Sequence, residues 1–286
     1  MDKILNNNGC IILAYKKFNE FLAAEQTWDN YQKIVLDAFP EMQYVHNTYL
    51  KWGSIDQGKF SEKIEKYKRH DFERFFNQYN ENFINKLYNS IINKAHNILK
   101  PVSADPVDLC LFLPYGGCFV NKEDSKTTIF MSLRINPKNA YKIMAHEYAH
   151  VLHMQRRPDE PLTLKREIIS EGIAVYLTTL MIDNIDNRIA IPFMPESSYQ
   201  WCEVNEQLIK DTILPELENN GEEIFFRFIS DGKTAKPPNG FVEKTAYYIG
   251  YRIIQLCIKK GLKLEEICAY DSETIIRNSE YFHINK

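Results

Sequence analysis

Five consecutive residues near the middle of the chain, His146 to His150, form the motif HExxH. Side chains at positions i and i+4 of an α-helix lie on the same face, so His146 and His150 could bind one Zn²⁺ ion together. Glu147 would lie one step further round the axis, where its carboxylate could accept a proton from a zinc-activated water molecule as a general base. The motif therefore predicts a hydrolytic zinc centre, provided that it lies on a helix.

The residues around the motif carry independent signals for a pair of helices. Asn136 and Pro137 supply an N-cap and a proline at the first helical position, and we expect this helix to run to about Arg157, with Pro158 in the connection. A second helix is expected from Leu164 to Met181, after a cap at Thr163. This context supports the interpretation of the motif as a metal site.

A catalytic zinc ion needs a third protein ligand and an open fourth position. The metzincin extension would require glycine at position 153 and histidine at position 156, where this chain has His153 and Arg156. Glu167 and Glu171 of the second helix lie one turn apart and are both candidates. We prefer Glu171 as the ligand, because the adjacent Gly172 has no side chain where two helices and a metal must come close. Glu167 would then orient a histidine or pair with a cation.

The rest of the chain predicts an α+β fold that is mainly α-helical. Apolar residues from Phe72 to Ile98 recur at steps of three and four, which indicates one helical stripe within a helical region from about Tyr15 to Lys100. Short β-branched runs between Val107 and Ile135, separated by the polar turn NKEDSK, predict two to four strands in a small antiparallel or mixed sheet beside the HExxH helix. The pair Gly116-Gly117 marks a bulge, a place where another chain approaches the backbone closely, or a plain turn.

The strings HEYAH and SEGIAVY resemble the glutamate-zincin superfamily, in which a glutamate on the next helix completes an HExxH site. The strings PYGGCFV, TIFMSL, MAHEYAHVLH, EIISEGIAVYL and AYYIGYRII are similar to a family of bacterial predicted zinc-dependent proteases, over about Val107 to Phe282. The resemblance implies that His146, His150 and Glu171 bind zinc and that Glu147 is the catalytic base.

The two prolines between Pro101 and Asp108 break the helical pattern, so we place a domain boundary there, after an N-terminal helical region over residues 1–100. The resemblance implies that residues 101–286 form a zincin-like metallopeptidase domain. It also implies that the strand before the HExxH helix pairs with an extended substrate. In similar enzymes a tyrosine or histidine from the C-terminal half stabilises the oxyanion, for which Tyr247 and Tyr251 are candidates on one helical face, with core packing as the alternative. His153 is expected to be a hydrogen-bonded structural histidine.

Composition narrows the classes of partner. The chain has 35 lysine and arginine residues against 38 aspartate and glutamate residues, a formal net charge of −3, so no positive field favours nucleic acid. No run approaches 18 apolar residues, and the N-terminal apolar run from Cys10 to Ala14 is too short for a signal peptide, which predicts a cytoplasmic protein without membrane segments. Six scattered cysteines are expected to be buried, reduced thiols.

These observations lead to one hypothesis and one alternative. The hypothesis is a zinc metallopeptidase with a peptide or protein substrate; no pattern in the sequence indicates its oligomeric state. The alternative is a catalytically silent zincin-fold module for binding or regulation. The presence of Glu147 favours the enzyme, because a purely structural zinc site gains nothing from a base beside the metal.

Overall fold

The computed structural model describes residues 2–123, 126–157 and 159–282. The chain forms two compact units, the first built from residues 1–92 and 104–147 and the second from residues 93–103 and 148–286. The division into residues 1–100 and 101–286 stays a prediction. Among the described residues, none of the helices combines the length and apolar character that a bilayer crossing requires.

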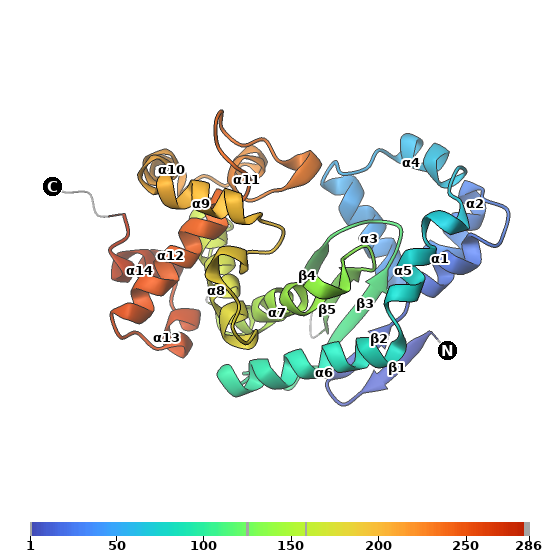
Figure 1. Ribbon diagram of the computed structural model, residues 1–286, viewed down its shortest axis with the longest axis horizontal. Helices are drawn as coiled ribbons and strands as arrows, with labels where there is room; N and C mark the ends of the chain where they lie inside the picture. Colours follow the sequence, from blue (N-terminus) through green and yellow to red (C-terminus); the bar gives the residue numbers. More distant parts are fainter. Residues whose placement is uncertain (1, 124–125, 158, 283–286) are drawn as a thin grey trace. The chain divides into compact units, whose positions relative to one another are not determined.

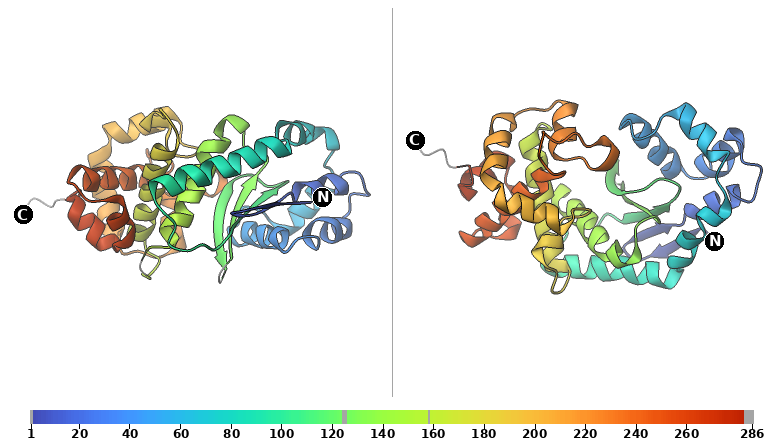
Figure 2. Two further views of the ribbon diagram at one scale, coloured as in Figure 1. Left: turned by 90° about the horizontal axis from the view of Figure 1, so that it is seen from below. Right: turned by 45° about the horizontal axis from the view of Figure 1, so that its top comes forward.

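The first unit contains one five-stranded mixed sheet (Figure 2). Its strands are β1 (Lys3–Asn6), β2 (Gly9–Ile12), β3 (Val107–Phe112), β4 (Cys118–Glu123) and β5 (Lys126–Ser132), in the spatial order β1-β2-β3-β5-β4. β3 pairs in parallel with β2 and β5, and the two outer pairs are antiparallel. The mixed sheet confirms the α+β prediction, but five strands exceed the expected two to four because β1 and β2 were not anticipated.

Two of the sequence-based expectations fall partly outside the described residues. β4 and β5 extend into the expected turn NKEDSK, and its two remaining residues, Asp124 and Ser125, are not described. The same holds for Pro158 in the connection after the HExxH helix.

Helices fill most of the remainder (Figure 1). Before the third strand lie α1 (Tyr15–Phe21), α2 (Trp28–Tyr31), η1 (Gln32–Leu36), α3 (Pro40–Lys51), α4 (Gln57–Ile64), η2 (Arg69–Asp71), α5 (Glu73–Gln78) and α6 (Glu81–Ile98). The expected single stripe from Phe72 to Ile98 is divided between α5 and α6. Tyr79 is extended there, at φ −121° and ψ 95°, and Asn80 caps α6 by accepting the Phe83 N–H at 2.8 Å.

After β5 the chain continues through α7 (Pro137–Met154) into helices of the second unit. These are α8 (Leu164–Met181), η3 (Asn187–Ile189), α9 (Glu196–Val204), α10 (Glu206–Ile213), η4 (Leu214–Glu216), α11 (Glu222–Phe228), η5 (Gly232–Thr234), α12 (Thr245–Lys259), α13 (Leu264–Ala269) and α14 (Ser272–Ser279). All six cysteines are free thiols; four are buried, whereas Cys10 and Cys118 are only partly buried.

α8 and α12 pack closely because each has a glycine at the contact. A Cβ atom on Gly172 would overlap the backbone of Gly250, and a Cβ atom on Gly250 would overlap the carbonyl oxygen of Ile168. Gly172 therefore does permit a close helix approach, as the sequence suggested, and the helix that it meets is α12.

Candidate metal centre

The HExxH motif lies on α7, as predicted, and the start of that helix is fixed from several directions. Asn136 caps it by accepting the Lys138 N–H at 3.0 Å. The preceding connection is held by α5 and the residue after it, since Gln78 and the Tyr79 hydroxyl donate to the carbonyls of Leu133 and Ile135, each at 2.7 Å. The N-terminal hundred residues thus help to position the motif.

The C-terminal half of α7 also forms hydrogen bonds with a neighbouring helix and within its own last turn. Tyr148, the third residue of the motif, shares a hydrogen bond of 2.7 Å between its hydroxyl and His96 Nε2. The helix ends at Met154, three residues earlier than expected, because the backbone N–H groups of Arg156 and Arg157 both turn back to the His153 carbonyl at 2.9 Å.

α8 has the predicted bounds, and its first turn carries the predicted cap. Thr163 accepts the Arg166 N–H at 3.4 Å. Two helical turns into α8, Glu171 is 8% exposed, and the adjacent Gly172 lies against α12. Burial of a carboxylate is costly unless a charge or a hydrogen-bond donor compensates it.

The structure brings His146, His150 and Glu171 together. One ligand atom from each lies within 4.8 Å of the others, and His150 Nε2 is 3.3 Å from Glu171 Oε2. Two ligands of a tetrahedral zinc ion, each about 2.1 Å from the metal, lie about 3.4 Å apart. His150 and Glu171 have this spacing, and two imidazoles with one carboxylate are a donor set that zinc accepts.

Ser170 contacts the side of His150 that faces away from Glu171. Its hydroxyl oxygen is 3.5 Å from Nδ1 of His150 and 3.5 Å from Nδ1 of His153. A partner at Nδ1 orients an imidazole ring whose Nε2 is the metal ligand. No motif in the sequence singled out Ser170, although it directly precedes Glu171 on α8.

His153 is buried at 4% exposure, in agreement with the structural role expected for it. Burial lowers its pKa to about 3, and the positive charges of His150 and nearby arginines act in the same direction. The imidazole is therefore neutral at pH 7.

Glu147 is 7% exposed and lies beside the first strand residue of β4. Burial raises the pKa of the Cys118 thiol well above its ordinary value, and the charge of Glu147 and a hydrogen bond to it raise the pKa further. The thiol therefore stays protonated and donates to the Glu147 carboxylate. From the sequence, Cys118 was expected only to be a buried, reduced thiol, since nothing local connects it to a residue 29 positions later.

Glu167, the alternative ligand, is not part of the three-residue group found among the described residues. Burial raises the pKa of its carboxyl, and the neighbouring charge of Glu171 raises it further. Glu167 is thus electrostatically coupled to Glu171, as two carboxylates one helical turn apart must be.

Tyr247 and Tyr251 both lie on α12 and are buried. The hydroxyl of Tyr251 donates to Asn187 Oδ1 at 2.7 Å, and its ring lies 6.4 Å from that of Tyr176. Tyr247 is 9% exposed, and the ammonium of Lys244 lies 4.6 Å above its ring centre. The hydroxyl of Tyr251 thus links α12 by a hydrogen bond to a residue that follows α8.

Residues 123–277 match the family described as "Predicted Zn-dependent protease (DUF2268)". The match covers more than half of the chain and includes His146, Glu147, His150 and Glu171. No curated protein matches the chain.

Proposed function

The chain belongs to this family of predicted Zn-dependent proteases, and on that basis we propose that it is a zinc metallopeptidase that hydrolyses peptide bonds. The observation that carries the proposal is the grouping of His146, His150 and Glu171 within 4.8 Å, with Glu147 on the same helix as both histidines. A site with two histidines, one carboxylate and an adjacent base is the arrangement that metal-assisted hydrolysis requires.

Each of these residues has a distinct role in the proposed reaction. When bound, zinc would polarise the scissile carbonyl and lower the pKa of a water molecule. Glu147 would take the proton from the attacking water and later deliver it to the leaving amine. Cys118, by donating to the Glu147 carboxylate, would hold it in one orientation, and Ser170 would do the same for the His150 ring.

Tyr247 and Tyr251 stay candidates for stabilising the oxyanion. Both are buried on α12, so core packing stays the alternative role for each.

The first test measures metal content. Zinc per chain is determined by elemental mass spectrometry for the wild type, Glu171→Ala and the matched variant Glu167→Ala, each reconstituted identically. We expect about one zinc in the wild type and in Glu167→Ala and a loss in Glu171→Ala. Wild-type protein without zinc would overturn the proposal, and loss from Glu167→Ala alone would reverse the ligand assignment.

The second test measures turnover. Zinc-loaded protein is incubated with a diverse peptide mixture, and the products are identified by mass spectrometry. Removing a general base typically lowers a rate 10²- to 10⁴-fold, so Glu147→Gln should keep its zinc and lose cleavage by about that factor. Undiminished turnover in Glu147→Gln would refute the mechanism, and an inert zinc-loaded wild type would favour a silent binding module.

A further inference from the structure

β4 lies at the edge of the sheet, and among the described residues its only partner strand is β5. The hydrogen-bonding groups along such an edge can pair with an extended peptide. Its first residue, Cys118, contacts Glu147, so a peptide lying along this edge would pass the proposed catalytic base. The side chains beside the edge then decide which peptides fit.

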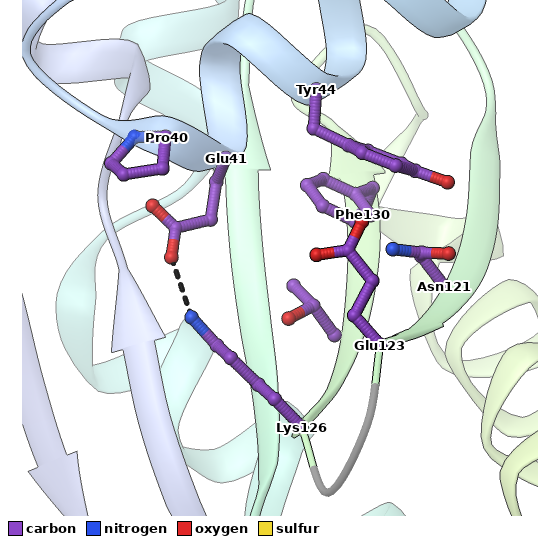
Figure 3. A pocket seen from close by; sticks show the side chains of 8 residues that line it. Pro40, Glu41, Tyr44, Asn121, Glu123, Lys126 and Phe130 are labelled. Atoms are coloured by element: carbon purple, nitrogen blue, oxygen red, sulfur yellow. Dashed lines mark hydrogen bonds and ion pairs between the residues drawn. The ribbon is translucent and has the colours of Figure 1, made fainter.

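Side chains of β4 alternate between the two faces of the sheet. Cys118 faces Glu147 on α7, so Phe119, Asn121 and Glu123 face the opposite side, where α3 lies. The rings of Phe119 and Phe130 stack at 4.9 Å. On Phe130 stacks Tyr44 of α3, at 5.4 Å (Figure 3). A peptide added to the edge would likewise place every second side chain on this side of the sheet, which we call the α3 face of β4.

The α3 face begins with an aromatic patch made of Tyr49, Trp52 and Phe119. The ring centres of Trp52 and Phe119 are 5.3 Å apart, and those of Tyr49 and Trp52 are 5.7 Å apart. Trp52 caps the C-terminus of α3 and is 41% exposed, although other residues of this helix are buried. The Tyr49 hydroxyl donates to the carbonyl of Gly116, which fixes the patch to the loop just before β4.

Two residues further along β4, the same face forms a polar pocket between α3 and the strands. It is lined by side chains that include Glu41, Tyr44, Asn121, Glu123 and Lys126 (Figure 3). Lys126 is 2.7 Å from a Glu41 oxygen and 3.5 Å from an Asp108 oxygen. The pocket lining thus contains two carboxylates, Glu41 and the exposed Glu123, and its one ammonium group is already paired with Glu41 and Asp108, so the remaining charge favours a cation.

We propose that the α3 face of β4 selects an extended peptide carrying an aromatic or large aliphatic side chain and, two residues away, a lysine or arginine. The first side chain would pack on the aromatic patch, and the second would reach Glu123 across Asn121. Alternate residues of a strand lie about 6.6 Å apart, the same spacing that separates Phe119 from Asn121. That the bound peptide is a substrate rests on the proposed function.

The patch and much of the pocket are built by residues 40–52, which precede the segment that matches the family. The proposal therefore gives the N-terminal region a second role besides positioning α7, namely the choice of peptide.

Binding tests the proposal without requiring turnover. Full-length, zinc-loaded Glu147→Gln protein is titrated with fluorescent ten-residue peptides by anisotropy. The parent peptides contain phenylalanine and lysine two residues apart, in both orders, and the comparison peptides have alanine for phenylalanine or glutamine for lysine. We expect the better parent to bind about tenfold more tightly than its alanine analogue, and its lysine preference to weaken at high salt.

Variants in the same background assign the preferences to residues. Trp52→Ala should remove the preference for phenylalanine, Trp52→Phe should keep it, and Glu123→Gln should remove the preference for lysine. Tyr270→Ala is the matched control, because Tyr270 is an aromatic residue of similar exposure, 37%, on the second unit. A phenylalanine preference that survives Trp52→Ala, or no measurable binding of either parent, would overturn the proposal.

The outcome separates this inference from the proposed function. Selective binding lost in Trp52→Ala, together with a wild type that cleaves nothing, would support the peptide site and refute the peptidase. Cleavage by the wild type with unchanged side-chain preferences in Trp52→Ala and Glu123→Gln would support the peptidase and refute the site.

Discussion

Replacing Gly172 by alanine tests whether the contact between α8 and α12 supports the metal ligand Glu171. The new Cβ atom would overlap the carbonyl group of Gly250, which is backbone and cannot swing aside. The opposite approach is also too tight for a side chain, since a Cβ on Gly250 would overlap the carbonyl oxygen of Ile168 and lie 2.9 Å from the Gly172 nitrogen. The two helices would therefore have to separate by roughly 1 Å to reach ordinary contact distances.

The expected magnitude follows from two opposing terms. Overpacking of this kind costs about 1–3 kcal/mol, and alanine regains up to about 1 kcal/mol of helix propensity relative to glycine. We expect a net loss of about 2 kcal/mol, which for a unit of this size lowers Tm by about 4–8 °C. Zinc affinity should also fall at least about tenfold, because metal–ligand distances tolerate only about 0.2 Å of error and Glu171 precedes the substituted residue.

The assays are thermal unfolding of EDTA-treated protein and competition for zinc with a chromophoric chelator. Gly58→Ala is the control, since Gly58 lies within α4 and its Cβ would meet only Asp56 Oδ1, at 3.5 Å. We expect the control to keep or raise Tm and to leave zinc affinity unchanged. A Tm of Gly172→Ala equal to or above that of the wild type would refute the packing argument.

Three further predictions follow from the site and its surroundings. Ser170→Ala should weaken zinc binding about 10- to 100-fold in chelator competition, because the His150 ring loses its Nδ1 partner, and unchanged affinity would contradict this. If Tyr247 or Tyr251 stabilises the oxyanion, its phenylalanine variant should lower kcat about 10²- to 10³-fold, and unchanged kcat in both variants would exclude both candidates. Burial lowers the pKa of His46, so its contribution to stability is fully present above its unfolded pKa of about 6.5 and is lost as pH falls below that value. His46→Gln should therefore flatten the decline of unfolding free energy from pH 7 to pH 5 in urea titrations, whereas an unchanged slope would show that His46 does not titrate there.

Local signals predicted the two helices of the candidate site well. The Thr163 cap and the bounds of α8 are confirmed, as is the Asn136–Pro137 start of α7. Caps and helical periodicity act over four or five residues, so one sequence is enough to read them. The grouping of Glu171 with the histidines could be anticipated because only a short connection separates the two helices.

Features that depend on distant pairing were not predictable in this way. β1 and β2 are four residues each, too short to show alternation, and β2 forms part of the sheet because Ile11 pairs with Leu109 far along the chain. The contact of Cys118 with Glu147 likewise depends on how the sheet is placed against α7. The sequence left the Gly116-Gly117 pair open between a bulge, a close approach of another chain and a plain turn; in the structure the pair directly precedes β4, and the Tyr49 hydroxyl donates to the Gly116 carbonyl.

The strand order β1-β2-β3-β5-β4 has a practical consequence for dividing the protein into fragments. A fragment limited to the family match, residues 123–277, would contain β5 and the final residue of β4 but neither β3 nor the N-terminal hairpin. β5 is buried along nearly its whole length, so both of its edges and its apolar side chains would face solvent. An unpaired apolar strand of this kind is prone to self-association, so we expect that residues 123–277 alone do not fold as an autonomous unit.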